Sequence, residues 1–310
     1  MNETEAKTGK GEYRDGVALW SAAASRAKTI AKETGGSSHA LLRRFVFDRF
    51  LARVFQEPNS PWVLKGGTAV LARVHDARTT KDVDLFHQAN SLDAALEALR
   101  EALTEVRIDD HFRFVITKVE PSLGGGQPAL GGYRVSVDAY CGAQKKDSFG
   151  VDLVTGSMMT THPEIRVATA LDVRGIAAAP LRLYPVVDHI ADKLCATQAT
   201  YGDAGTQRSS RVRDLVDLVV LGRTQDIDGD ELIAAISAEW VHRSLPGRPV
   251  FAPPALWETQ YPRIARTVGA CEGITTFPAA VAFVTVLLNP ALNGSAAGQR
   301  WSAALGNWKA

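Results

Sequence analysis

Paired cysteines are missing from this sequence. Its 310 residues include only Cys141, Cys195 and Cys271, and no two of them form a CxxC pair. This pattern excludes a disulfide framework and a cysteine-based zinc site, and it is typical of a protein with reduced thiols. The 7 histidines never form an HxxxH pair, so a zincin-like metal site has no support either.

Long apolar runs and an excess of charge are missing as well. The longest apolar run near the end, 279–288, is too short to span a bilayer, and the polar N-terminus lacks the apolar stretch of a signal peptide. Lys and Arg (35) balance Asp and Glu (34), which argues against a basic field that coats long stretches of nucleic acid. A local basic groove is still compatible with this balance. We therefore expect a cytoplasmic protein that does not enter the membrane.

The remaining composition is that of an ordinary globular protein. Hydrophobic residues make up 45% and charged residues 22%, and the length allows one large domain or two ordinary ones. Strand signals stop near residue 183, and only helical patterns follow. We therefore predict an α+β fold with a disordered tail at 1–14, an α/β lobe at 15–182 and a helical lobe at 183–310.

Hydrophobic periodicity predicts the elements within these lobes. In the first lobe, helices are predicted at 16–33, 38–56, up to about 73 and at 91–106, and strands at 62–64, 81–86, 112–119, 133–141 and 149–154, with a glycine-rich hairpin loop at 122–133. In the second lobe, helices are predicted at 185–200, 210–222, 229–242, 255–267 and 278–289, with a short one near 295–308. The second helix carries four arginines that we interpret either as a solvated surface or as contacts for nucleic acid or triphosphate: Arg43, Arg44, Arg49 and Arg53.

Two aspartates on one predicted strand carry the main functional signal. Alternate residues of a strand face the same side, so Asp82 and Asp84 point together while Val83 and Leu85 enter the core. Two carboxylates held this close repel each other unless a cation lies between them. Their hard oxygen atoms suit Mg²⁺, which completes its shell with waters and substrate phosphates. The strand therefore predicts a magnesium site.

The segment before this strand has the features of a phosphate site. The pair Gly66-Gly67 lets backbone N–H groups approach a triphosphate closely, and Thr68 opens a helix whose positive end favours the same anion. Thr80 lies two residues before Asp82 on the same strand face, so we expect its hydroxyl to face the site. There it either contacts phosphate or is a place where modification silences the protein, because a phosphate would add about two negative charges.

A third carboxylate is expected from a neighbouring strand. Asp152 lies in FGVDLV between apolar residues and near a glycine that gives access, and Asp138 in YRVSVDAY is the alternative. We prefer Asp152. Three carboxylates and two metal ions would arrange in-line attack of an acceptor hydroxyl on the α-phosphate of a nucleotide.

The segment LKGGTAVLARVHDARTTKDVDLF resembles the first motif of DNA polymerase β-type nucleotidyltransferases, most closely the AbiEii/MenT toxin family. Two later segments strengthen the resemblance: VDHIADKL at 187–194 resembles the lysine-bearing helix of that family, and RVRDLVDL at 211–218 resembles its R-x-(K/R)-D-x-x-D-L helix. The resemblance covers about 60–222. It implies a polymerase β-like core, a mixed sheet with helices, followed by a helical lobe that carries Lys193 and Asp214.

The resemblance also implies roles for residues of these motifs. Lys193 is expected to place a compact positive charge on the β- and γ-phosphates. Asp214 either orients Lys193 or helps to activate the acceptor hydroxyl. Arg211 and Arg213 either bind phosphate or acceptor, or pair with acidic residues of their own helix. The expected nucleotide-binding set is Lys65, Gly66, Gly67, Thr68, Arg78, Thr80, Arg211 and Arg213, the expected metal ligands are Asp82, Asp84 and Asp152, and the expected catalytic residues are Asp82, Asp84, Lys193 and Asp214.

The function that the resemblance implies is that of a Mg²⁺-dependent toxin of a toxin–antitoxin pair, using two metal ions. It would transfer NMP from an NTP to RNA, with the 3′ acceptor end of tRNA as the expected target, and so block translation. A separately encoded antitoxin is the expected protein partner. Transfer to a small molecule or a protein is an alternative, because the same core serves all of these acceptors. A regulator that only binds NTP is a third reading, and the full set of charged motif residues argues against it.

Overall fold

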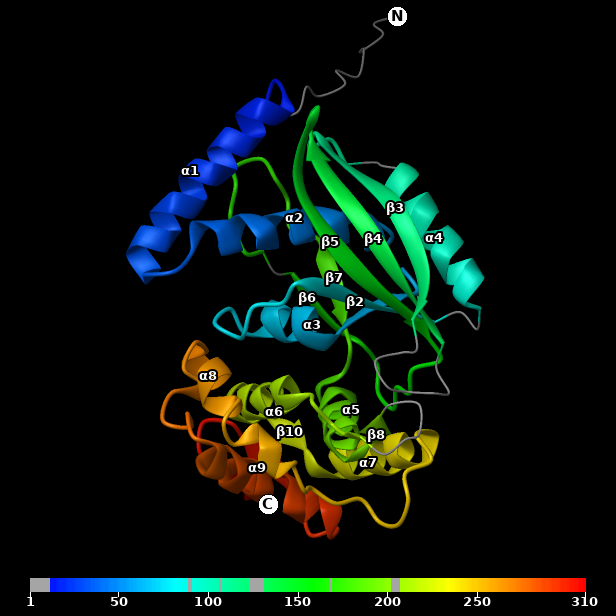
Figure 1. Ribbon diagram of the computed structural model, residues 1–310, viewed down its shortest axis with the longest axis vertical. Helices are drawn as coiled ribbons and strands as arrows, with labels where there is room; N and C mark the ends of the chain where they lie inside the picture. Colours follow the sequence, from blue (N-terminus) through cyan, green and yellow to red (C-terminus); the bar gives the residue numbers. More distant parts are fainter. Residues whose placement is uncertain (1–11, 89–90, 106–107, 123–130, 168, 202–206) are drawn as a thin grey trace, which may run out of the picture.

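A computed structural model describes residues 12–88, 91–105, 108–122, 131–167, 169–201 and 207–310. Most of the tail predicted at 1–14 and of the glycine-rich loop at 122–133 therefore lies outside the described residues. Figure 1 shows a twisted sheet with α1, α2 and α4 in one half of the molecule and the helices α5 to α9 in the other, with α3 between them.

The sheet of the first half has seven strands in the order β3-β4-β5-β2-β1-β7-β6. Its strands are β1 (Trp62–Lys65), β2 (Asp82–His87), β3 (Phe112–Ser122), β4 (Gly132–Cys141), β5 (Gln144–Thr155), β6 (Glu164–Val167) and β7 (Pro180–Leu183). The pairs β1–β7 and β2–β5 are parallel and the other neighbours are antiparallel. The sheet is therefore mixed, as predicted.

Three of the described helices belong to this half, α1 (Gly16–Thr34), α2 (Ser38–Val54) and α4 (Leu92–Thr104), and α3 (Gly66–Arg73) lies between the halves. Each of the helices α1, α2 and α4 is preceded by an N-cap residue whose side-chain oxygen accepts a hydrogen bond from a first-turn N–H group. Both α2 and α4 pack against β5. Val83 of β2 and Val151 of β5 are fully buried in the core of this half. Because side chains alternate along a strand, the neighbours of these valines face the opposite side of the sheet.

The second half is built from helices with small sheets. It contains α5 (Val186–Gln198), α6 (Val212–Thr224), α7 (Gly229–His242), α8 (Tyr261–Ala265), α9 (Phe277–Leu292), the 3₁₀ turns η1 (Ala255–Trp257) and η2 (Gly269–Cys271), and the short strands β8 (Thr200–Tyr201), β9 (Gln207–Arg208), β10 (Ile227–Asp228), β11 (Arg300–Ser302) and β12 (Asn307–Lys309). Its core includes Trp257 and Trp301, both fully buried. Val70 of α3 belongs to this second core, whereas Ala69 belongs to the first. The helix α3 thus packs against both halves. The domain boundary between residues 182 and 183 stays a prediction.

The α+β class is confirmed, and three local predictions are wrong. The region beyond residue 183 contains strands, and the helix predicted near 295–308 is the hairpin of β11 and β12, where Trp301 pairs with Ile227 of β10. The helix predicted at 255–267 is interrupted between η1 and α8, just before Pro262. No helix in the described ranges is long and apolar enough to cross a membrane.

Candidate active site

The parallel register of β2 and β5 brings the predicted carboxylates together. Asp84 lies directly opposite Asp152, and Asp82 lies opposite Gly150. The intervening Val83 is fully buried in the core, so the two aspartates of β2 face the other side of the sheet. That side opens into a cleft of about 600 Å³.

The cleft is formed by residues of both halves of the molecule. Its walls are Gly66, Gly67, Arg78, Thr80, Asp82, Asp84, Asp152, Lys193, Ser210, Arg211, Val212, Arg213, Asp214, Gln260, Arg263 and Ile264. Of the residues predicted for the site, only Lys65 and Thr68 are not among them. The alternative third carboxylate, Asp138, is also absent from the walls, and it is held by Lys145 and Ser148 instead.

Gly66 forms the turn that the cleft needs. It has a positive φ of 58°, and a Cβ atom at this position would collide with the Asp84 carboxylate. A Cβ at Gly67 would lie 3.1 Å from the Arg78 guanidinium. At Gly66 only a residue without a side chain lets α3 begin this close to Asp84, whereas at Gly67 the Arg78 side chain would have to shift by a few tenths of an ångström.

Three predicted phosphate-site residues donate hydrogen bonds to other groups of the protein. The Lys65 Nζ atom donates to Ser157 Oγ at 3.0 Å and lies 4.2 Å from the centre of the Tyr184 ring. The hydroxyls of Thr68 and Thr80 both donate to the carbonyl oxygen of Asp82, at 2.9 and 3.1 Å. Thr68 therefore ties α3 to the start of β2, while Thr80 also lines the cleft.

The electrostatics of Asp84 indicate a place for a cation. Burial raises the pKa of Asp84 to about 6, and the negative charge of Asp152 adds to the effect, although Lys193 and two arginines oppose it. A carboxylate with a raised pKa gains from a positive charge brought close to it. Three carboxylates that offer only hard oxygen atoms fit Mg²⁺ by their chemistry.

Sequence reasoning missed five residues of the cleft wall, Ser210, Val212, Gln260, Arg263 and Ile264, and it also missed Arg134 of β4, which contacts two of the predicted metal ligands. Its Nη1 atom lies 2.7 Å from Asp152 Oδ1, and its Nη2 atom donates to Asp82 Oδ1. In this conformation, and within the described ranges, no three His, Cys, Asp or Glu side chains are grouped closely enough to hold a metal ion. The guanidinium therefore supplies positive charge to two of the predicted metal ligands.

Lys193 of α5 lies at the centre of a buried chain of charges. Its Nζ atom is 2.7 Å from Asp214 Oδ1 and 2.9 Å from Asp217 Oδ2, and only 3% of the side chain is exposed. Burial opposes its charge, but the two aspartates outweigh burial and raise the pKa of Lys193. Asp217 also accepts two hydrogen bonds from Arg78, at 2.7 and 2.8 Å. Lys193 is thus a fixed cation with both aspartates as its supports.

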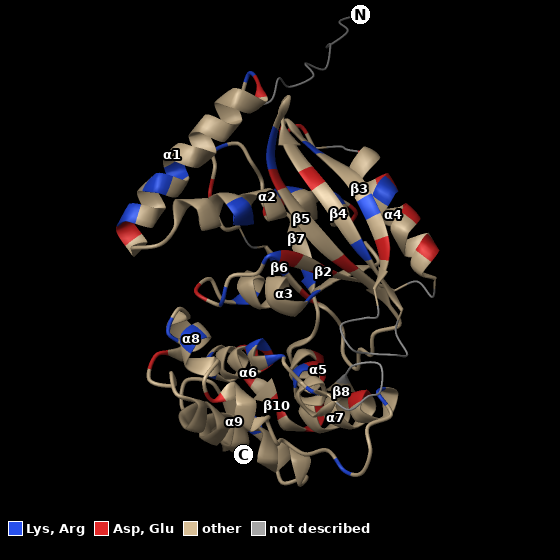
Figure 2. Cartoon of the chain, in the orientation of Figure 1, with Lys and Arg blue, Asp and Glu red and all other residues tan. Residues whose placement is uncertain are grey.

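The remaining arginines differ in their contacts. Arg211 donates to Asp214 Oδ2 at 2.7 Å, as the pairing alternative predicts. Arg213 is exposed at the cleft, and no ion pair to it is found among the described residues. Arg263 of α8 lies on the same wall. Figure 2 shows basic residues of α6 and α8 on the side that faces α3, opposite the wall that carries the aspartates of β2 and β5.

An α+β fold in which a Gly-Gly turn and strand-borne aspartates face a buried lysine is that of a nucleotidyltransferase. The family described as nucleotidyl transferase AbiEii toxin of type IV toxin–antitoxin systems matches residues 49–281. The chain belongs to this family.

Solved structures with a similar chain trace include two bacterial proteins. MenT4, a nucleotidyltransferase toxin from Mycobacterium tuberculosis, is 17% identical over 74% of this chain and 74% of its own, with a TM-score of 0.46. JHP933 from Helicobacter pylori is 17% identical over 83% of this chain and 94% of its own, with a TM-score of 0.43. Comparison with curated protein sequences gave no match.

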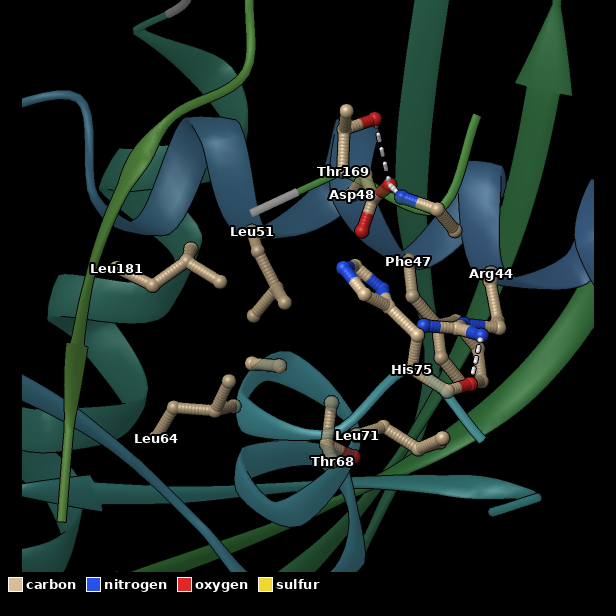
Figure 3. A pocket seen from close by; sticks show the side chains of 12 residues that line it. Arg44, Phe47, Asp48, Leu51, Leu64, Thr68, Leu71, His75, Thr169 and Leu181 are labelled. Atoms are coloured by element: carbon tan, nitrogen blue, oxygen red, sulfur yellow. Dashed lines mark hydrogen bonds between the residues drawn. The ribbon is translucent and has the colours of Figure 1, made fainter. Parts of the chain in front are cut away.

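A second cavity lies on the other side of α3. It has a volume of about 30 Å³, room for a water molecule or two, so it is too small for a nucleotide. Figure 3 shows the Asp48 carboxylate at its edge, turned toward Thr169. Asp48 accepts hydrogen bonds from the Thr169 hydroxyl and from the N–H group of Ala170. Burial nevertheless raises the pKa of Asp48 to about 6.

This raised pKa gives a stability effect with a defined sign. The folded carboxyl holds its proton more tightly than the unfolded one, so Asp48 contributes stability below about pH 4 that is lost as the pH rises through about 6. Asp48→Asn keeps the acceptor oxygen and cannot ionise. We expect the free energy of unfolding of the variant, relative to wild type, to increase by about 2 to 3 kcal/mol between pH 4 and pH 7.5.

Urea unfolding at pH 4, 5, 6 and 7.5 measures this difference. Asp172→Asn, at an exposed position of the following loop, controls for the change of carboxylate to amide. A constant difference between Asp48→Asn and wild type across this range would contradict the prediction.

Proposed function

We propose that this protein is a Mg²⁺-dependent nucleotidyltransferase toxin that transfers NMP from an NTP to RNA in the cytoplasm. The expected acceptor is the 3′ end of tRNA, whose modification would block translation, and the expected partner is a cognate antitoxin. The observation that carries the proposal is the cleft in which Asp82, Asp84 and Asp152 face Lys193 and the arginines of α6 and α8. Metal ions and a triphosphate are the ligands that such opposed charges would accommodate.

The roles follow from the contacts. Asp82, Asp84 and Asp152 would hold the divalent cations, which when bound neutralise phosphate oxygens and favour attack on the α-phosphate. The Gly66-Gly67 turn would place backbone N–H groups near the triphosphate because no side chain blocks it. Lys193, fixed by its two aspartates, would stabilise the charge that develops as pyrophosphate leaves.

The contacts of Asp214 favour one of its two predicted roles. One carboxylate oxygen accepts from Lys193 and the other from Arg211. Both oxygens of this carboxylate are therefore occupied, and only 3% of the side chain is exposed, so neither oxygen is available to an acceptor hydroxyl. We therefore assign Asp214 to the orientation of Lys193 rather than to proton removal from the acceptor.

An RNA acceptor agrees with the charges at the mouth of the cleft. Arg213 and Arg263 line the cleft on the wall opposite the aspartates. Two arginines at an entrance suit contacts to a few phosphates near an RNA end, while the net charge of +1 gives no long basic surface.

Labelling of RNA tests the proposal. The purified protein is incubated with Mg²⁺, total tRNA and each α-³²P-labelled NTP in turn, beside an Asp82→Ala variant. We expect label in RNA with the wild type only, and the labelled lane identifies the nucleotide. Absence of RNA labelling with every NTP would contradict the RNA acceptor, and the same nucleotides are then tested with small molecules and proteins.

A further inference from the structure

Arg134 holds two of the proposed metal ligands at once. It reaches from β4 across β5 to β2, with one guanidinium nitrogen on Asp152 and the other on Asp82. The three side chains are all partly exposed, with 36%, 38% and 40% of Arg134, Asp82 and Asp152 accessible. The cluster therefore lies at the open cleft, where a solvated ion can reach it.

The absence of a side chain at Gly150 leaves space for this guanidinium. Gly150 is the residue of β5 that lies beside Asp82 of β2 and beside Ser136 of β4. A Cβ atom at Gly150 would collide with the Nε, Cζ and Nη2 atoms of Arg134. Its φ is not among the positive values in the chain, so the missing side chain, rather than an unusual backbone, is what the position requires.

The charge arrangement explains why an arginine is needed there. Asp84 and Asp152 are directly opposite on adjacent strands, and Asp82 lies two residues before Asp84 on the same face. Without a counter-ion the repulsion among the carboxylates would disfavour the arrangement. On the other side of Arg134, the residue opposite on β3 is Glu120, an exposed acid that pairs with Lys118. An alternative acidic neighbour is thus one strand away from the site.

We propose that Arg134 is an internal counter-ion that occupies the carboxylate site in the metal-free protein and competes with the entering divalent cation. The inference rests on the proposed metal site. Arg134 keeps Asp82 and Asp152 in position until a cation replaces the guanidinium, so the affinity for metal reflects the strength of the two Arg134 contacts. Gly150 is the positioning residue that permits those contacts.

Titration with Mn²⁺ tests the competition directly. The full chain is freed of metal with EDTA, the chelator is removed, and free Mn²⁺ is followed by its electron paramagnetic resonance signal in the absence of nucleotide. Because two charge-assisted hydrogen bonds must break before the cation binds, we expect Arg134→Gln to bind Mn²⁺ about tenfold or more tightly than wild type. We expect its melting temperature to fall in the metal-free state and to recover with Mn²⁺.

Gly150→Ala is the matched variant. It displaces the guanidinium without removing its charge, so we expect tighter Mn²⁺ binding in the wild-type background and no further change in the Arg134→Gln background. A lower melting temperature with unchanged Mn²⁺ affinity in both single variants would overturn the inference and leave the metal site intact. Absence of Mn²⁺ binding in wild type and variants alike would overturn the metal site, and with it the proposed function.

Discussion

Asp84→Asn is expected to abolish nucleotidyl transfer and at the same time to stabilise the metal-free protein. The amide loses the negative charge that would hold a divalent cation, and removal of one such electrostatic contact lowers rates by about 10²- to 10³-fold. The stability gain has a separate origin. The folded pKa of Asp84 is raised to about 6, so ionisation of this carboxyl destabilises the fold above that pH. At pH 7.5 in EDTA, removal of the charge is expected to contribute about 2 to 3 kcal/mol.

Transfer to tRNA measures the effect on activity. Urea unfolding of the same preparation in EDTA measures the effect on stability. Asp138→Asn is the matched control, because Asp138 lies on the same sheet but pairs with Lys145 outside the cleft. The control is expected to keep full activity. Full activity of Asp84→Asn would contradict the place of Asp84 in the metal site. Unchanged stability of the active variant would also contradict the account of the electrostatics of Asp84.

The acidic strand was predictable because it depends only on local alternation. Val83 and Leu85 mark the buried side of β2, so the direction of Asp82 and Asp84 follows from the sequence itself. Arg134 was not predictable in this way. Its contact with Asp152 depends on the register of β4 with β5, which shifts between Ala139 and Tyr140. No local pattern encodes that register.

The arginines of α2 show the same limit. The sequence predicts Arg49 and Arg53 either on a solvated surface or in contact with nucleic acid or triphosphate, and both predictions are wrong, because both side chains are buried against Asp110. Arg53 donates to both oxygens of this aspartate, 57 residues away in sequence. Helical periodicity separates polar from apolar faces, but it does not reveal that a distant carboxylate lets an arginine enter the core.

Similarly, the spacing of Asp214 and Asp217 predicts that they share a helix face, and the structure shows what the shared face holds. Both carboxylates contact Lys193, which comes from a different helix. Asp217 is fully buried, and its contacts with Lys193 and Arg78 make it a structural support of the site. The sequence motifs predict Lys193 and Asp214 as site residues, whereas the packing of α5 against α6 determines which carboxylates contact the lysine.

Lys193→Gln is expected to cost stability as well as activity. The substitution leaves Asp214 and Asp217 buried without their shared cation, and breaking such a buried pair costs about 3 to 5 kcal/mol. We expect the lower end, about 3 kcal/mol, because Arg211 still pairs with Asp214 and Arg78 with Asp217. Urea unfolding measures the loss. Transfer is assayed at a temperature where circular dichroism shows the variant folded, and we expect it to fall about 100-fold or more.

Two further variants separate the contribution of Lys193 to stability from its part in the reaction. Adding Asp214→Asn to Lys193→Gln removes one of the two negative charges that Lys193 neutralises, so we expect it to restore part of the lost stability while the double variant stays inactive. Lys81→Gln, an exposed lysine beside the acidic strand, is expected to change stability by less than about 0.5 kcal/mol. If Lys193→Gln has the same urea midpoint of unfolding as the wild type, the buried Asp214 and Asp217 do not depend on Lys193. The assignment of Lys193 as a fixed cation on the phosphates would then fail as well.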